Sequence, residues 1–252
     1  MINIALSGAC GKMGRVIAEL VENYPNCRIA AGIDPAGGKY AGFEVFRNIS
    51  DVEEKPDVLI DFSHPSALSD ILSYCKMRGV PAVIATTGYT QDETAKIKSA
   101  SSLIPVFFTF NMSLGINLLA DLARRAVRVL GGQFDTEIIE KHHNHKKDSP
   151  SGTAIMLADA LNEERCNALR YVYGRSGTHR PRIKDELGIH SVRGGTIVGE
   201  HEIIFAGHDE IISLSHSALS REVFANGAIN AALFLAQCEK GLYDMSDLLK
   251  NI

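Results

Sequence analysis

The fold is decided by the N-terminal stretch Ile2-Asn-Ile-Ala-Leu-Ser-Gly-Ala-Cys-Gly-Lys-Met-Gly14. In this stretch an apolar run is followed by a glycine-rich turn, and a helical pattern begins after the turn. Residues 2–6 predict a short strand. After the turn, apolar side chains recur at helical spacing at Val16, Ile17, Leu20 and Val21. The glycines have the spacing Gly-x-x-Gly-x-x-Gly, a variant of the pattern that lets the backbone approach a dinucleotide pyrophosphate at a helix N-terminus.

The second apolar run, residues 29–33, ends in an acidic residue that fits the same hypothesis. Asp34 lies about 20 positions after Gly14, where a carboxylate would reach a ribose hydroxyl. In the alternative interpretation, residues 8–14 are only a tight turn, and Asp34 is a turn former before Pro35. The succession of strand, glycine turn, helix, strand and carboxylate favours the nucleotide site.

Strands and helices continue to alternate through the next part of the chain. The expected strands are 57–62, 80–85 and 104–108, and the expected helices are 65–77 and 91–101. This order is typical of a parallel, doubly wound sheet, in which ligands bind beyond the carboxyl ends of the strands. Small polar or aromatic groups follow three of these strands, at 62–64, 86–88 and 110–112.

The pattern changes after Gly115. Helices are expected at 116–130 and 154–162, and strands at 134–141, 169–173, 189–192, 196–205 and 210–216. A last apolar helix, 222–240, is expected to pack back on the first domain. The predicted fold class is therefore α/β, with an N-terminal Rossmann-like dinucleotide-binding domain. The second domain is predicted to be α+β, with a mixed, mostly antiparallel sheet.

Residues 140–153, Glu-Lys-His-His-Asn-His-Lys-Lys-Asp-Ser-Pro-Ser-Gly-Thr, combine three imidazoles and two ammonium groups with the start of a helix. Imidazoles titrate near neutral pH, and a helix N-terminus beside lysines attracts anions. The stretch could hold a small acidic substrate and move a proton. A basic surface loop is the plainer alternative. A metal site is not expected, because only Asp148 could join His142 and His145, and nearby lysines would repel a cation.

The composition of the whole chain excludes several classes of function. A net charge of −4 gives no reason to expect nucleic acid or an anionic membrane surface as a partner. Five scattered cysteines without a Cys-x-x-Cys pair fit a reducing compartment. No apolar run is long enough to span a bilayer, and the N-terminus has no signal-peptide pattern. We expect a cytoplasmic protein.

These motifs together resemble the 4-hydroxy-tetrahydrodipicolinate reductase (dihydrodipicolinate reductase) family of the diaminopimelate route to lysine. The histidine motif is highly specific, whereas the glycine motif alone is not. The matching motifs span nearly the whole chain in the family's order, at residues 8–14, 85–88, 111–115, 142–154, 193–201 and 220–228.

The resemblance implies NAD(P)H-dependent reduction of 4-hydroxy-tetrahydrodipicolinate, via dihydrodipicolinate, to tetrahydrodipicolinate. It implies that His142 is the acid–base residue and Lys146 a second donor. Substrate, a small dicarboxylate, would contact His143, Gly152 and Thr153. The cofactor, NADH and/or NADPH, would contact Gly8, Ala9, Cys10, Gly11, Lys12, Met13, Asp34, Ala85, Thr86, Thr87, Thr109, Phe110, Asn111 and Met112.

The resemblance also implies a dinucleotide-binding domain of residues 1–114 and 222–252, and a substrate-binding and tetramerisation domain of residues 115–221 that forms a homotetramer. The sequence departs from the family's best-known pattern in two places. Lys12 replaces a frequent arginine, and Pro35 stands where an arginine often follows the acidic residue. Both positions bear on recognition of a 2′-phosphate, so the choice between NADH and NADPH stays open.

Two other functions remain open at this point. One is an NAD(P)-dependent oxidoreductase with the same nucleotide fold and a different acid substrate. The other is a redox sensor that binds the nucleotide without turnover. A sensor would have no need of a histidine and a lysine beside an anion-binding helix start.

Overall fold

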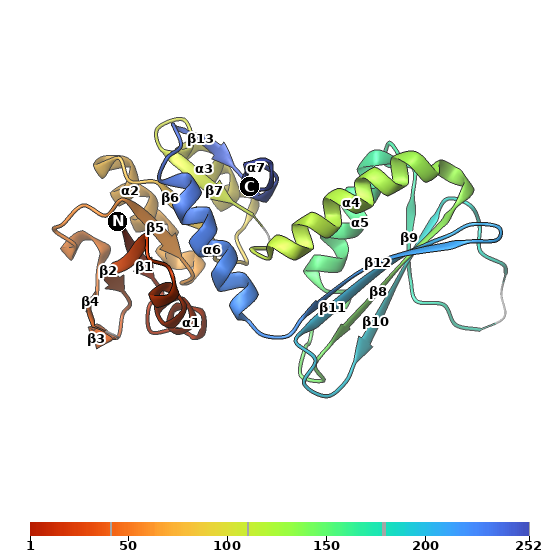
Figure 1. Ribbon diagram of the computed structural model, residues 1–252, viewed down its shortest axis with the longest axis horizontal. Coiled ribbons are helices and arrows are strands. Elements are labelled where there is room, and N and C mark those ends of the chain that lie inside the picture. The colour runs from red at the N-terminus through yellow and green to blue at the C-terminus, as the bar shows by residue number, and fades with distance from the viewer. Residues whose placement is uncertain (41, 110, 178–179, 252) are drawn as a thin grey trace. The chain divides into compact units, whose positions relative to one another are not determined.

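The computed structural model describes residues 1–40, 42–109, 111–177 and 180–251 (Figure 1). This part of the chain divides into two compact units. One contains residues 1–114 and 221–252, and the other contains residues 115–220. Within the described ranges, no helix is long and apolar enough to cross a membrane.

The first unit is built on an eight-stranded sheet in the order β13-β7-β6-β5-β1-β2-β4-β3. Its pairings are parallel except for the antiparallel pair β3–β4, which confirms the predicted doubly wound sheet. The strands are β1 (Ile2–Ser7), β2 (Cys27–Ile33), β3 (Gly38–Tyr40), β4 (Phe43–Phe46), β5 (Val58–Asp61), β6 (Ala82–Ile84), β7 (Pro105–Phe108) and β13 (Gly241–Tyr243).

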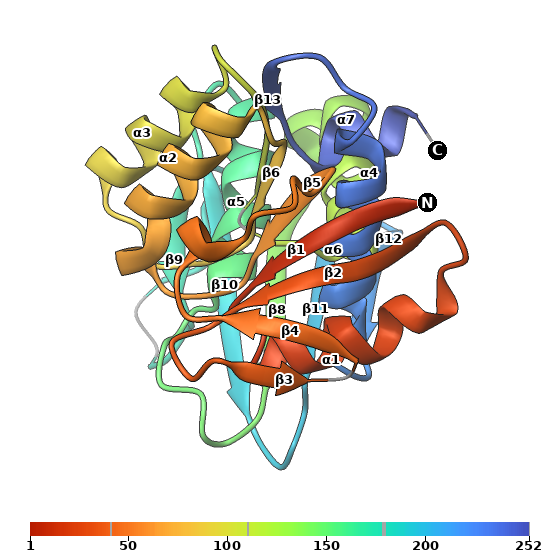
Figure 2. The same ribbon diagram turned by 90° about the vertical axis from the view of Figure 1, so that its left-hand side faces the viewer.

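Helices cover both faces of this sheet (Figure 2). Strand β1 shows why, since Ile4 and Leu6 join the core beneath α1 and α6 while Ala5 joins the core beneath α2 and α3. The side chains of a buried parallel strand alternate between two apolar layers. The helices are α1 (Lys12–Leu20), α2 (Leu68–Arg78), α3 (Gln91–Ala100), α6 (Glu222–Leu235) and α7 (Met245–Lys250).

The last part of the chain differs from the expected single helix 222–240. Helix α6 ends at Leu235, Gly241 begins the edge strand β13 beside β7, and a capping box of Asp244 and Asp247 starts α7. Apolar periodicity stops after Ala236, because the polar residues Gln237, Glu239 and Lys240 cannot continue the buried stripe.

Helix α6 lies very close to the segment that follows β7. A Cβ added at Gly227 would stand 1.7 Å from the carbonyl oxygen of Met112, so only glycine fits there. The neighbouring Ala225, Ala228 and Ile229 are fully buried in the core that α6 shares with α1. The late helix is therefore an integral part of the first unit.

The second unit contains a five-stranded sheet in the order β12-β11-β8-β10-β9. The sheet is mixed, as predicted, and its pairings are divided equally between two parallel and two antiparallel ones. The chain crosses over between β8, β9 and β10, and crossovers give parallel neighbours. The strands are β8 (Asp135–His142), β9 (Arg170–Tyr173), β10 (Glu186–Arg193), β11 (Gly199–Ala206) and β12 (Ile211–Ala218).

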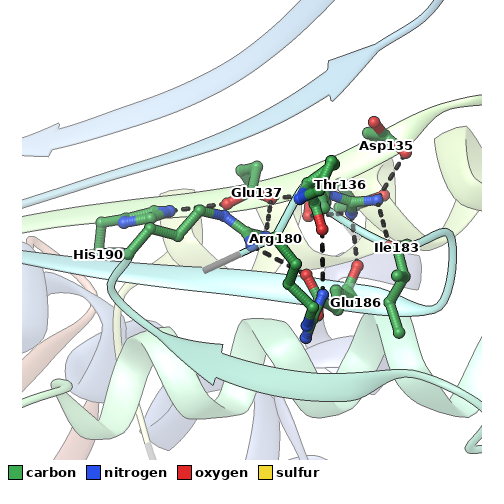
Figure 3. A network of polar contacts seen from close by, with 10 residues as sticks. Asp135, Thr136, Glu137, Arg180, Ile183, Glu186 and His190 are labelled. Atoms are coloured by element: carbon green, nitrogen blue, oxygen red, sulfur yellow. Dashed lines mark hydrogen bonds and ion pairs between the residues drawn. The ribbon is translucent and has the colours of Figure 1, made fainter. Parts of the chain in front are cut away.

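Helices α4 (Leu114–Leu130) and α5 (Gly152–Glu164) pack on one face of this sheet. The other face carries an ionic network that anchors the arginine-rich segment before β10 (Figure 3). Arg175 bonds Glu137 and Glu186, Arg182 bonds Glu137, and Arg180 bonds Glu186. One face of the sheet is therefore covered by α4 and α5, and the other face is charged.

Candidate functional site

His142 and Glu140 form a hydrogen-bonded pair at the carboxyl end of β8. His142 Nδ1 lies 2.6 Å from Glu140 Oε2, and the Glu140 side chain is completely buried. Both residues alternate with Ile138, so they lie on the face covered by helices. The strand was expected to end before His142, but it includes this residue, and the imidazole is consequently held by the sheet.

Arg193 and Ser151 complete the surroundings of Glu140. Arg193, opposite His142 on β10, donates from Nη1 to Oε2 and from Nη2 to Oε1, both at 2.7 Å. The backbone N–H of Ser151 donates to Oε1 at 3.1 Å. Burial raises the pKa of Glu140, but hydrogen bonds from Arg193, Ser191 and His142 outweigh burial and lower that pKa to about 2.

The ionised Glu140 determines which nitrogen of His142 carries the proton. A carboxylate only accepts hydrogen bonds, so Nδ1 must donate and Nε2 keeps its lone pair. Burial lowers the pKa of His142, the Glu140 carboxylate opposes this effect, and the charges of Lys146 and Arg193 reinforce it. A Cβ at Gly199 would lie 3.2 Å from His142 Nε2, so glycine preserves the space beside this nitrogen.

His201 connects the same region to the start of α5. Its Nε2 lies 3.0 Å from Ser151 Oγ, and its ring packs edge-on against His142 with the centroids 5.2 Å apart. Ser151 Oγ also accepts from the N–H of Ala154, which makes Ser151 the N-cap of α5. Burial, together with the charge of His142, lowers the pKa of His201 to about 4. We therefore expect His201 to be neutral at neutral pH.

The other side chains predicted for substrate lie along the segment from β8 to α5. Lys146 pairs with Asp148 at 2.7 Å, and Nδ1 of His143 is buried without a hydrogen-bond partner among the described residues. Gly152 opens α5, whose first turn contains no acidic residue, and a Cβ there would meet no atom within 4 Å. Thr153 follows in the same turn. Cationic side chains and a helix N-terminus thus lie along one segment, a combination suited to a carboxylate.

No larger cluster of metal-binding side chains accompanies these histidines. Across the described ranges, no group of three or more histidine, cysteine, aspartate or glutamate residues could hold a metal ion.

In the first unit, the predicted nucleotide residues lie at the start of α1 and the end of β2. Gly8 has a φ of +79°, and a Cβ at Gly14 would stand 2.2 Å from the Gly8 carbonyl oxygen, so this turn requires both glycines. Asp34 accepts from the N–H of Cys10 at 3.1 Å, which links the turn to β2. Gly11 is the N-cap of α1 without a side-chain cap, and the first turn has no acidic residue. The arrangement fits a pyrophosphate.

The remaining predicted cofactor residues follow other strands of the same sheet. Ala85 and Thr86 are buried after β6, and Thr87 is exposed. Thr109 bonds the backbone of Asn111 after β7, Met112 is buried in the core, and Phe110 lies outside the described residues. In the glycine turn and the start of α1, Ala9 is buried, Met13 is half-buried and Lys12 is exposed. Parallel strands place all these segments at one edge of the sheet.

Sequence reasoning missed the polar residues that surround His142. Glu140 was part of the histidine stretch without a role, and Arg193 and His201 stood only in a matching motif. One signal for Glu140 was available in the sequence. Ile138, Glu140 and His142 are spaced two residues apart, so on a strand their side chains lie on the same face. A second missed group is the completely buried Asp61, which accepts from Ser63 and Tyr89 beside the predicted nucleotide edge.

Neutral His201 stabilises the fold at neutral pH, and acid removes this contribution. Its pKa is about 4 in the folded chain and about 6.5 when unfolded, so the contribution is full above pH 6.5 and disappears as pH falls toward 4. At pH 5 the loss is about 2 kcal/mol of unfolding free energy. We expect His201→Gln to reduce the difference between urea unfolding at pH 7 and pH 5.

His208→Gln is the control for this measurement, because the His208 side chain is 98% exposed. The control should retain the wild-type difference between the two pH values. An unchanged pH dependence in His201→Gln would contradict the assignment of His201 as a histidine held neutral by burial.

Comparisons with known proteins identify the family of the chain. The family models described as "Dihydrodipicolinate reductase, N-terminus" and "Dihydrodipicolinate reductase, C-terminus" match residues 2–112 and 115–249. The 4-hydroxy-tetrahydrodipicolinate reductase of Caldanaerobacter subterraneus subsp. tengcongensis is 49% identical over 251 residues, covering 100% of this chain and 99% of that protein. The enzyme of the same name from Clostridium tetani is 45% identical and covers 100% and 98%.

A solved structure supports the same assignment. The dipicolinate-bound dihydrodipicolinate reductase from Paenisporosarcina sp. TG-14 superposes with a TM-score of 0.81 at 28% identity, covering 97% of each chain. The fold, the order of the motifs and full-length similarity thus agree, and the chain belongs to the dihydrodipicolinate reductase family of oxidoreductases.

Proposed function

We propose that this chain catalyses the NAD(P)H-dependent reduction of 4-hydroxy-tetrahydrodipicolinate, via dihydrodipicolinate, to tetrahydrodipicolinate in the diaminopimelate route to lysine. The observation that carries the proposal is His142, whose Nδ1 is fixed by a buried carboxylate while Nε2 keeps its lone pair. The names of the relatives, and dipicolinate in the solved structure, support a small cyclic dicarboxylate as substrate.

The segment between β8 and α5 would bind the carboxylates of this substrate. In the ligand-free chain, Lys146 is already paired with an anion, the exposed Asp148. A substrate carboxylate can take the place of Asp148 and gain a charge-assisted hydrogen bond. The N-terminus of α5 at Gly152 and Thr153 would favour a carboxylate there, and His143 would provide a further polar contact through its buried Nδ1.

The reaction requires loss of the 4-hydroxyl group as water, addition of hydride to the resulting conjugated imine, and protonation of the enamine that forms. The reduced nicotinamide, when bound, supplies the hydride. His142 holds the proton on Nε2 and delivers it to the ring, and the Glu140 carboxylate stabilises the imidazolium before transfer. Lys146 and the α5 N-terminus offset the negative charge of the substrate.

The first unit offers a fitting place for the dinucleotide. The α1 N-terminus has neither a capping side chain nor an acidic residue in its first turn, which suits a pyrophosphate. Asp34 lies at the end of β2, where its carboxylate would accept hydrogen bonds from an adenosine ribose. The nucleotide residues would therefore bind and orient the cofactor without taking part in proton transfer.

Replacement of His142 provides the first test of this function. We expect wild-type protein to oxidise NADH or NADPH in the presence of freshly prepared substrate. His142→Gln should lower turnover about 10²- to 10⁴-fold, because general acid catalysis contributes that much. Cofactor affinity should change little, since the nucleotide residues belong to the other unit. Turnover near the wild-type value would assign the proton to another group.

Calorimetric titration of dipicolinate is the control for this experiment, because this planar dicarboxylate cannot readily be reduced. Wild type and His142→Gln should both bind it in the presence of cofactor. Lys146→Ala should bind it roughly ten- to a hundredfold more weakly, as expected for a hydrogen bond to a charged group worth about 1.5–3 kcal/mol. Absence of binding in all three proteins would contradict the substrate assignment and favour a sensor.

The choice of cofactor follows from the charges near Asp34. A carboxylate accepts hydrogen bonds from a ribose 2′-hydroxyl and repels a 2′-phosphate. Arg47 is a cation in this part of the first unit. Arg47 follows Phe46, whose carbonyl accepts from the N–H of Asp34, and its side chain lies against Gly37. Among the described residues Arg47 has neither an ion pair nor a hydrogen bond. We infer that NADH is used at least as well as NADPH.

This inference predicts a ratio of specificity constants. The kcat/KM for NADPH should not exceed that for NADH by more than about tenfold, which corresponds to 1.4 kcal/mol. Arg47→Ala should lower kcat/KM for NADPH and leave that for NADH unchanged, and Lys12→Ala serves as the comparison. A much larger preference for NADPH in wild type would show that a cation outweighs Asp34.

We also propose that the chain forms a homotetramer through the second unit. The sheet face opposite α4 and α5 carries the exposed apolar residues Val192 and Ile211, and β12 is an edge strand. An uncovered face and an open edge are natural pairing surfaces. Light scattering at micromolar concentration should give the mass of four chains, and Ile211→Glu should lower it. A monomer mass for the wild type would refute the proposal.

A further inference from the structure

We propose that Glu140 is a positioning residue for proton transfer, and that Arg193 holds it in the orientation that fixes the tautomer of His142. The inference rests on the proposed function, since it assigns to His142 the proton that the reaction consumes. It adds two residues, from β8 and β10, that reach the reaction only through the imidazole.

Two hydrogen bonds of defined length reach each oxygen of the Glu140 carboxylate, and the Ser191 side chain is a further hydrogen-bond partner. Oε1 accepts from Arg193 Nη2 at 2.7 Å and from the Ser151 N–H at 3.1 Å. Oε2 accepts from Arg193 Nη1 at 2.7 Å and from His142 Nδ1 at 2.6 Å. With the side chain completely buried, no bulk water competes for these positions. Both oxygens of the carboxylate are therefore held by protein donors.

Among the partners with defined distances, His142 is the one that can change its role. A guanidinium and a backbone N–H always donate, whereas an imidazole nitrogen can either donate or accept. Arg193 and Ser151 together require an anion at this position, and that anion requires the proton of His142 to be on Nδ1. The result is that Nε2, beside the space left by Gly199, is the nitrogen that takes up and releases a proton.

The groups that face His142 from the other elements would otherwise oppose its protonation. Lys146 from the following turn and Arg193 from β10 lower its pKa by their charge, and burial lowers it most. His201 from β11 packs against the ring. Within the set that acts on His142, Glu140 is the negative group that favours an imidazolium, so its charge matters for proton transfer as well as its geometry.

The same carboxylate also connects the imidazole to the carboxylate-binding end of α5. Glu140 bonds the backbone of Ser151, and Ser151 caps the helix that begins at Gly152. Arg193 additionally donates to the backbone carbonyl of Asp148, the partner of Lys146. The proton-transfer group and the proposed anion-binding groups are consequently fixed to one buried carboxylate, which sets their relative positions.

Glu140→Gln tests the proposal with little change in shape. The amide places an NH₂ group where one oxygen stood, and both positions face donors. Arg193 and the Ser151 N–H can only donate, whereas His142 Nδ1 can accept, so the NH₂ should turn toward Nδ1 and move the imidazole proton to Nε2. We expect turnover to fall about 10²- to 10⁴-fold, with the affinity for NADH and dipicolinate within about threefold of wild type.

Two readouts separate this role from a merely structural one. Nitrogen-15 NMR of the ligand-free protein should show His142 protonated on Nδ1 in the wild type and on Nε2 in Glu140→Gln. The alkaline limb of the pH profile of kcat should move to lower pH, because loss of the carboxylate lowers the pKa of His142. Glu200→Gln is the matched control, since it removes a carboxylate paired with Lys141 on the same sheet and should change neither readout.

The outcomes are distinguishable from failure of the proposed function. A wild type without reductase activity would contradict the function, while the NMR measurement would still test the tautomer. An active wild type with His142 protonated on Nε2 would overturn the inference even if Glu140→Gln did not fold. Unchanged turnover and an unchanged pH profile in a folded Glu140→Gln would overturn it as well.

Discussion

The ion pair of the buried Glu140 with the half-buried Arg193 is the interaction that connects the main parts of the second unit. It joins neighbouring strands β8 and β10 and reaches the first residue before α5. Desolvating two such charges costs several kcal/mol per ion, and the two parallel hydrogen bonds must offset that cost. An apolar pair could stabilise the sheet equally well, so the retained charges fit the role in proton transfer that we propose for Glu140.

The sequence was sufficient to predict the elements with strong periodicity. Strand β1, the glycine turn and α1 were predicted because an apolar run, φ-permissive glycines and a 3.6-residue repeat occur in immediate succession. Helices α4 and α5 and the strands of the second sheet were found for the same reason. The histidine segment was recognisable because its residue types are unsuited to a core, but its pairing with Glu140 was not predicted from the sequence.

Features that depend on distant parts of the chain could not be predicted in this way. Strands β3 and β13 have three residues each, too few for a periodic signal, and they exist because neighbouring strands offer open edges. Arg193 lies 53 positions from Glu140 in the sequence, and only the register between β10 and β8 brings them together. Whether two neighbouring strands are parallel or antiparallel likewise depends on how the chain connects them, and the periodicity of apolar residues carries no information about these connections.

The position of α6 has a consequence for how the chain folds during synthesis. The face of the first sheet beneath α1 is completed by residues that follow the whole second unit, including Ala228 and Ile229. A ribosome therefore releases β1 to β7 with an apolar face that stays open while another hundred or so residues are made. The second unit is continuous in sequence and can form first. Nascent chains paused within it would expose the unfinished face and become targets for chaperones that bind apolar surfaces.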